Sequence, residues 1–367
     1  MAYDSDTRVK ETLKEISRDA KLKNLNLRIF DESNEDQRHW TKGGLTFGPE
    51  ACLYGSNDAG WFLKKPYLIN NKKVADFTPV LIVEGSYGTE TGNTGSAQYA
   101  RFSHALGAVI DGFIGVYFIP FESTYRKADG SETTAYLRYD MIYAALNASE
   151  EEKGEYLFID AYNTDLMVRF LKILDEGNKW KIKKIIKRIK RTMKNFADVH
   201  SPTAERVYLY NKERVGKLLM FNVVSFSACN FRTNKKYKAG RFRNGHTIVG
   251  DALINLYWHK KPFDLVLARF THEDCRKLDG LKQKEWLLLR THKNIRVITL
   301  DDLKFKDQKL EKRLRNFVDE LPLLGKSLLM KNKLAKEILN GFLDKSIQIN
   351  EENVRVNKYG HLSKSNK

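Results

Sequence analysis

The chain has 367 residues, and its 64 lysines and arginines against 46 aspartates and glutamates give a formal net charge of +18. Hydrophobic residues make up 42% of it, which excludes a disordered chain and allows one elaborate domain or two to three smaller ones. The excess of positive charge favours a polyanionic partner, because lysines and arginines that contact phosphates release condensed counterions.

The three cysteines, Cys52, Cys229 and Cys275, lie far apart and lack the spacing of a metal site. We therefore expect reduced thiols and a cytoplasmic location. The first residues are polar and no apolar run reaches transmembrane length, so we expect neither a signal peptide nor a membrane partner.

Residues 5–22 have apolar side chains at helical spacing and predict an amphipathic helix. Segment 24–57 is rich in turn-forming residues and predicts loops. The pattern that follows predicts a β-hairpin, with arms over 60–69 and 74–83 and a turn over Asn70–Lys72.

The stretch from Pro79 to Pro120 predicts a strand, a glycine-rich loop, a helix and a second strand. Residues 80–83 form the first, buried strand, which ends at Glu84. An acid at the carboxyl end of a strand lies where open α/β sheets place their chemistry. A phosphate-binding loop is excluded, because no lysine occurs between Lys73 and Lys127.

Two short motifs resemble those of the PD-(D/E)XK nuclease superfamily, which includes most type II restriction endonucleases. They are Glu84-Gly85-Ser86 at the strand end and Gln98-Tyr99-Ala100-Arg101-Phe102 on the helix behind it. The resemblance implies that Glu84 is the first acid of the E-x-K element and that Gln98, with Phe102 four residues on, corresponds to the Gln-x-x-x-Tyr element. It also implies a restriction-endonuclease-like α/β core, a mixed central sheet flanked by helices, with added helical and β-α-β elements.

In that superfamily the metal site joins an aspartate on one strand to the acid on the next, so the resemblance implies that Glu84 shares a Mg²⁺ ion. If the hairpin pairs symmetrically about its turn, the numbers of paired residues sum to 142 and Asp58 faces Glu84. Asp76 is an alternative, although about 26 Å separate it from Glu84 along a straight strand. A kink at Thr78-Pro79 would bring Asp76 back, and Glu50 is a third candidate.

Ser86 stands where the superfamily has a lysine. Ser86 or Gln98 would then orient the attacking water. Alternatively Lys64, the nearest lysine by the hairpin pairing, would replace the missing one.

Farther along, the pattern predicts a turn over 125–130, a helix over 138–149, a strand over 156–159 and a helix over 164–176. From Lys179 to Lys194 every charged residue is basic, while apolar residues at helical spacing give this predicted helix one docked face. We expect phosphate contacts from four residues of its other face: Lys183, Lys187, Arg188 and Arg191.

A basic loop with interleaved aromatic residues is predicted over 230–244. Its Arg241, Arg243 and Asn244 are candidates for contacts with base edges or phosphates. The elements predicted around it are strands over 206–210 and 218–226, a helix over 248–258, a β-α-β unit with parallel strands over 263–300 and a helix over 308–344.

Four regions are expected along the chain. They are a nuclease core with its N-terminal helix (1–160), a basic helical DNA-gripping region (161–235), an α/β region that reads DNA or extends the sheet (236–350) and a flexible tail (351–367).

Together with the resemblance, these features predict a Mg²⁺-dependent, site-specific endonuclease, a type II restriction enzyme that hydrolyses phosphodiester bonds of double-stranded DNA. A companion DNA methyltransferase is expected in the same restriction-modification system, and a homodimer is one arrangement left open. Two other interpretations stay open. One is a basic nucleic-acid-binding protein without catalysis, in which Glu84 is structural, and the other is an enzyme that acts on RNA or on a flipped base.

Overall fold

The computed structural model of the protein describes residues 5–30, 38–41, 44–47, 57–87, 96–126, 129–200, 209–210, 219–221, 243–267, 271–273, 288–289, 292–316, 337–338 and 340–354. The chain divides into two compact units, Met1–Thr203 with Val249–Lys260, and Ala204–Ile248 with Lys261–Lys367. This division differs from the four regions expected from the sequence, because the basic helix belongs to the same unit as the expected nuclease core.

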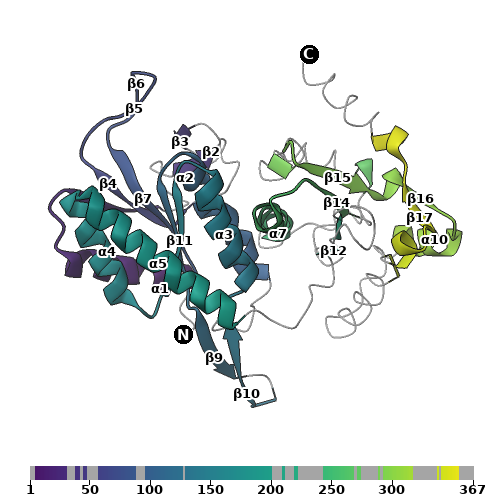
Figure 1. Ribbon diagram of the computed structural model, residues 1–367, viewed down its shortest axis with the longest axis horizontal. Coiled ribbons are helices and arrows are strands. Elements are labelled where there is room, and N and C mark those ends of the chain that lie inside the picture. The colour runs from purple at the N-terminus through teal and green to yellow at the C-terminus, as the bar shows by residue number, and fades with distance from the viewer. Residues whose placement is uncertain are drawn as a thin grey trace. The chain divides into compact units, whose positions relative to one another are not determined.

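A five-stranded mixed sheet forms the centre of the first unit (Figure 1). Its strands, in spatial order, are β1 (Leu25–Ile29), β4 (Ala59–Leu63), β7 (Thr78–Gly85), β8 (Ile114–Phe118) and β11 (Glu155–Ile159). The first three strands pair antiparallel, and β8 and β11 continue from β7 in parallel. The expected class, a mixed α/β sheet with flanking helices, is confirmed.

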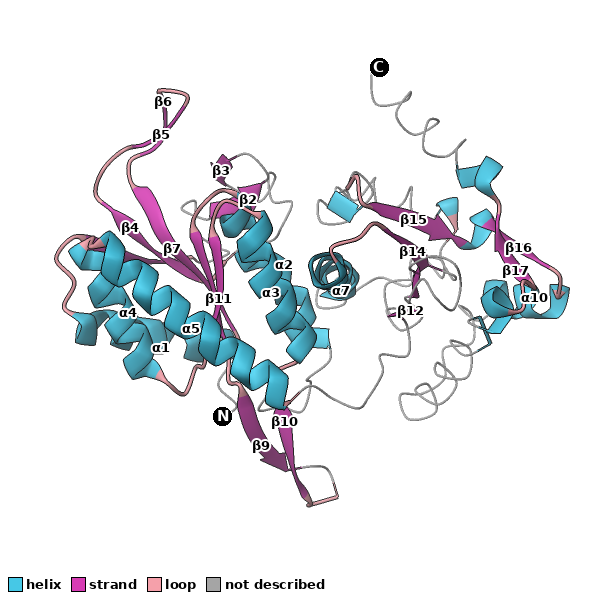
Figure 2. Ribbon diagram, in the orientation of Figure 1, coloured by secondary structure: helices cyan, strands magenta, loops and turns pink. Residues whose placement is uncertain are grey.

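Helices pack on the strands of this sheet (Figure 2). The helices of the unit are α1 (Ser5–Ala20), α2 (Ser96–Ile110), α3 (Tyr139–Glu151), α4 (Thr164–Glu176), α5 (Lys179–Val199) and most of α7 (Arg243–His259). α2 joins β7 to β8, since two parallel strands need a crossover connection. A Cβ atom on Gly85 would collide with Val9 of α1, and one on Gly115 with the main chain of α2 at Ala105. Because Gly85 and Gly115 face opposite sides of the sheet, α1 and α2 cover opposite faces.

The predicted hairpin forms, and the strands pair in the predicted register next to Asp58 and Glu84. Ala59 pairs with Val83, Gly60 with Ile82 and Trp61 with Leu81, and each pair of numbers sums to 142. A register shift after Trp61 changes the pairing farther along. The far end of the hairpin continues as β5 (Tyr67–Ile69) and β6 (Lys72–Ala75), joined by two asparagines with positive φ, Asn70 (49°) and Asn71 (62°).

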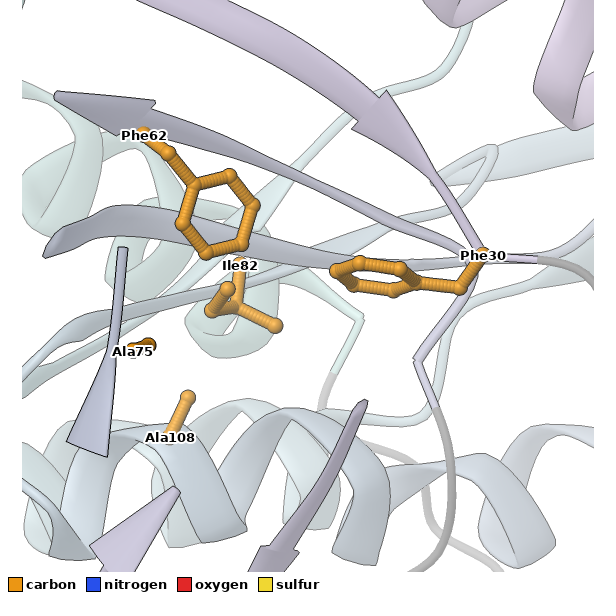
Figure 3. Close-up of a cluster of buried hydrophobic side chains, with 5 residues drawn as sticks. All are labelled: Phe30, Phe62, Ala75, Ile82 and Ala108. Atoms are coloured by element: carbon orange, nitrogen blue, oxygen red, sulfur yellow. The ribbon is translucent and has the colours of Figure 1, made fainter. Parts of the chain in front are cut away.

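A cluster of buried apolar side chains supports the sheet under α2 (Figure 3). It consists of Phe30, Phe62, Ala75, Ile82 and Ala108. Ile82 lies two residues before Glu84 on β7, so the two side chains point to the same face. The cluster therefore fixes the strand that carries the predicted catalytic acid.

Two further hairpins complete the first unit: β2 (Arg38–Thr41) with β3 (Gly44–Phe47), and β9 (Glu122–Arg126) with β10 (Glu132–Tyr136). The second unit has a four-stranded sheet, in the order β12 (Leu209–Tyr210), β13 (Leu219–Phe221), β14 (Phe263–Leu267) and β15 (Ile295–Thr299). The remaining elements are the 3₁₀ turn η5 (Leu300–Asp302), the pair β16 (Leu303–Phe305) and β17 (Ile347–Ile349), and α10 (Gln308–Asn316). The predicted parallel pairing of the β-α-β strands is confirmed by β14 and β15.

Two predictions of local structure are wrong. β1 lies where loops were expected; only its first residue, Leu25, is buried, so its apolar signal is weak. Helix α7 begins at Arg243 rather than near residue 248, so Arg243 and Asn244 are helical and do not belong to a loop. Glu351, the first residue of the expected tail, pairs with Arg296 of β15 at 2.5 Å, and residues 355–367 lie outside the described residues. No helix in the described ranges is long and apolar enough to cross a membrane.

Candidate active site

Glu84 lies at the end of β7 and points toward α2, with 1% of the residue exposed. It pairs in register with Tyr117 on the parallel strand β8. An ionised carboxylate in such a place must be compensated by hydrogen bonds or by opposite charge. Helix α2 supplies both through Arg101.

Asp58 immediately precedes β4 and is attached to β7 by its main chain and by its side chain. Its amide donates a hydrogen bond to the carbonyl of Val83 at 3.1 Å, and its Oδ2 atom accepts one from the amide of Gly85 at 2.8 Å. The carboxylate is largely buried, with 13% of the side chain exposed. Its position is therefore set by the strand that carries Glu84.

Arg101 on α2 contacts both acids through one nitrogen. Its Nη1 atom lies 3.0 Å from Oε1 of Glu84, 2.8 Å from the carbonyl oxygen of Gly85 and 3.7 Å from Oδ2 of Asp58. His104, one helical turn later, places Nδ1 3.2 Å from Oε2 of Glu84. Each oxygen of the Glu84 carboxylate thus has a contact with a basic side chain of α2.

Tyr117 and Ser86 complete the surroundings. Burial raises the pKa of the Tyr117 phenol well above its usual value; Arg101 lowers it, while the charges of Glu84 and Asp58 raise it further. A hydrogen bond to the Ser86 side chain acts in the lowering direction. Ser86 is itself buried and brings no charge, so it does not replace the positive charge of a lysine.

The structure brings together Asp58 and Glu84 and separates the alternative acid from them. Asp76 precedes the start of β7, is exposed and forms an ion pair with Lys73 at 2.5 Å. β7 continues from Thr78 to Gly85 as one strand, which leaves Asp76 distant along it. Lys64 is exposed and follows the end of β4, whereas Asp58 precedes its start. Lys64 therefore does not replace the missing lysine.

Several predicted site residues lie outside the described residues. Glu50 and Arg241 do so entirely, and for Gln98, Arg243 and Asn244 the structure describes the helical main chain but not the side chain. Phe102, the partner of Gln98 in the second motif, is fully buried and packs on Tyr156, with ring centroids 4.9 Å apart. It belongs to the core.

Arg101 and His104 were not predicted as site residues. Arg101 belongs to the motif Gln98–Phe102 and lies three residues after Gln98. His104 lies three residues after Arg101. That spacing places all three on one helical face, so the sequence did contain a signal for them.

The oxygen atoms at this site are of the kind that Mg²⁺ prefers. Magnesium is bound in proteins by one or two carboxylates, with water and substrate phosphate completing its octahedron. Asp58, Glu84 and the Gly85 carbonyl offer oxygens to one common position, marked by Arg101 Nη1. Among the described residues, no group of three or more His, Cys, Asp or Glu side chains is placed to hold a metal ion, so the Gly85 carbonyl, water and substrate phosphate would have to complete the site.

Helix α5 has two distinct faces. Ile185, Ile189 and Met193 are buried against the unit, and the four predicted phosphate-binding residues, Lys183, Lys187, Arg188 and Arg191, are exposed. Three other lysines of the helix pair with acids: Lys181 with Glu176, Lys190 with Glu155 and Lys194 with Asp198.

Comparisons with known proteins add no family or fold to this picture. The chain matches no protein-family model, no curated protein and no solved structure.

Proposed function

We propose that the protein is a Mg²⁺-dependent, site-specific DNA endonuclease, a type II restriction enzyme whose first unit is a restriction-endonuclease-like core. The observation that carries the proposal is the convergence of Asp58 and Glu84, from neighbouring strands, on one cationic position. This is the arrangement that the superfamily resemblance requires: an aspartate at one strand and an acid at the next.

Asp58, Glu84 and the carbonyl of Gly85 would hold the ion. A bound Mg²⁺ ion supplies a water of lowered pKa and neutralises charge on the phosphate. Asp58 and Glu84 are held in place by the Gly85 amide and by His104, so the two acids need little rearrangement. The Nδ1 atom of His104 lies 3.2 Å from Oε2 of Glu84, so the imidazole limits where that carboxylate can move.

The exposed basic face of α5 supports a nucleic-acid substrate. Four cations on one helix face, with apolar residues docking the other, fit a row of phosphates better than they fit a small ligand. Phosphate contacts carry no sequence information, so base recognition is assigned to other elements, among them the region of Arg241, Arg243 and Asn244. Cutting both strands calls for two sites, which favours a homodimer acting in the cytoplasm beside a methyltransferase that protects the host DNA.

A second candidate function is binding without catalysis. The observation in its favour is that Arg101 already neutralises Glu84 while His104 contacts its other oxygen, as a purely structural network would. In that case the basic helix would bind nucleic acid and the acid pair would only stabilise the fold.

Digestion of plasmid DNA separates the two. We expect discrete fragments with Mg²⁺ and intact plasmid with EDTA, under conditions in which the protein binds DNA in both. Duplex RNA of matched length serves as the alternative substrate. Binding without cleavage at any divalent ion concentration would favour the second candidate.

A further inference from the structure

We infer that Arg101 is a displaceable counter-ion: it holds Asp58 and Glu84 in the metal-free protein and releases them when a divalent cation binds. This inference rests on the proposed function, because it concerns the same acid pair.

The three oxygens around Arg101 belong to one compact site. Its Nη1 atom is within 3.7 Å of a carboxylate oxygen of each acid and within 2.8 Å of the Gly85 carbonyl. A magnesium ion would need such oxygens at about 2.1 Å. A guanidinium and a dication cannot share that space, since their charges repel at short range. Binding of the cation and the contacts of Arg101 are therefore mutually exclusive.

Arg101 is the member of the cluster that can leave. Asp58 is fixed by the Gly85 amide, and Glu84 is buried on a central strand and contacts His104. Arg101 has a long side chain on the covering helix, is 20% exposed, and makes its longest contact to Asp58. A rotamer change of one arginine leaves the acids in place for another cation.

Arg101 also supplies the positive charge that the sequence lacks at Ser86. Without it, two carboxylates would lie near each other in a buried site and would lose the guanidinium that contacts both of them. Such a pair repels and is costly to ionise. The metal-free protein therefore needs Arg101, whereas the metal-bound protein does not.

Thermal unfolding of Arg101→Met, with Mg²⁺ titrated from an EDTA buffer and no DNA present, tests the inference. In EDTA the variant should melt below the wild type, because its acids are uncompensated. Mg²⁺ should then raise the variant's Tm by more than it raises that of the wild type. The apparent Kd for Mg²⁺ should fall by about 10-fold or more, within the range of typical coupling between competing sites.

The second unit provides a matched control. Arg296 also lies between two acids, at 2.7 Å from Asp264 and 2.5 Å from Glu351. Arg296→Met should lower the Tm in EDTA without a gain in the response to Mg²⁺. If Mg²⁺ raised the Tm of both variants by the same amount, any pair of acids that has lost its arginine would bind the ion, and the inference would be wrong. An Arg101→Met variant that Mg²⁺ does not rescue would make Arg101 a fixed structural ion pair.

Arg101→Lys covers the case in which Arg101→Met does not fold. Lysine keeps the charge but not the planar fork of donors, so it should hold the acids less firmly. We expect it to fold and to bind Mg²⁺ more tightly than the wild type; unchanged or weaker binding overturns the inference. These measurements contain no DNA, so they test competition between Arg101 and Mg²⁺ separately from cleavage. A protein that does not cleave DNA can still show this competition, and a protein that cleaves can lack it.

Discussion

The main-chain amide of Gly85 donates a hydrogen bond to Oδ2 of Asp58 at 2.8 Å, joining the end of β7 to the residue before β4. The acid pair is thus a product of strand register, which the pairing of Ala59 with Val83 fixes. A slip of one residue would turn one acid to the other face of the sheet. The apolar cluster that includes Phe62 and Ile82 opposes such a slip, so packing of the core and placement of the acids are linked.

Glu84→Gln should lower the rate of DNA cleavage by at least about 100-fold. A metal ligand contributes several kcal/mol to the transition state, and about 1.4 kcal/mol is a factor of ten. The amide keeps the volume of the side chain and can still accept a hydrogen bond from Arg101, so the Tm and the binding of random DNA should stay near wild type. Single-turnover rates, melting curves and binding isotherms check these outcomes.

The exposed Glu122→Gln on β9 is the control and should cleave normally. Glu84→Ala is a poorer test, because it removes an ion-pair partner of Arg101 together with a buried side chain and should destabilise the fold. Retained cleavage by a folded Glu84→Gln protein would refute the assignment of this site.

Asp58→Asn should reproduce the loss of cleavage, and Asp76→Asn should behave like the wild type. Asp58 contacts Arg101 and the Gly85 amide beside Glu84, whereas Asp76 is exposed and pairs only locally with Lys73 among the contacts described above. Cleavage rates of the two variants, measured side by side, check the choice between the acids. A loss of activity in Asp76→Asn but not in Asp58→Asn would reverse it.

Replacing Lys183, Lys187, Arg188 and Arg191 with Gln should weaken DNA binding without changing its sequence preference. Each phosphate contact contributes about 0.9 to the slope of log K against log salt, so the slope should fall by about three to four if all four residues make contact. The control is Lys181→Gln with Lys194→Gln on the same helix. These lysines already pair with Glu176 and Asp198 and should change the slope less. An unchanged slope in the quadruple variant would place the DNA elsewhere.

The sequence was sufficient for the parts of the site that depend on local pattern. The buried run before Glu84 and the asparagine turn at Asn70 and Asn71 together predict the register that brings Asp58 to Glu84. The apolar periodicity also predicted the bounds of α4 and a helix from Lys179, which agrees with the start of α5; in the structure Asn163 and Asn178 cap these two helices.

What the sequence did not predict depends on contacts between distant segments. Arg101 and His104 acquire their roles only because α2 crosses over β7 and β8, and a helical arginine in isolation is typical of a solvated surface. β1 is an edge strand whose five residues are mostly half-buried, so its pairing with β4 leaves little trace in hydrophobic pattern. Helix α7 contacts α3, where Asn147 donates a hydrogen bond to the carbonyl of Tyr257 at 2.9 Å. The two residues are far apart in the sequence, so no local pattern predicts this contact.

Loss of the proton from Asp140, at the start of α3, should lower the free energy of unfolding as the pH rises from about 4 to about 6. Burial raises its pKa from 3.8 to about 6, helped by the charge of Asp251, although Arg138 acts in the opposite direction. Between these two pH values the folded protein binds the Asp140 proton more tightly than the unfolded chain does, so the free energy of unfolding falls as the pH rises. The loss from this one group is about 3 kcal/mol and is complete above the folded-state pKa.

Asp140→Asn cannot titrate and should remove this part of the pH dependence. Urea unfolding at several pH values between 4 and 7 measures it, and the difference between wild type and variant should change by about 3 kcal/mol across the range. The exposed Asp19→Asn on α1 should keep the wild-type profile. The Nε and Nη2 atoms of Arg138 lie 3.2 Å and 3.1 Å from the oxygens of Asp140. If the free energies of unfolding of wild type and Asp140→Asn changed in parallel with pH, this ion pair would compensate the carboxylate, and burial would not dominate its titration.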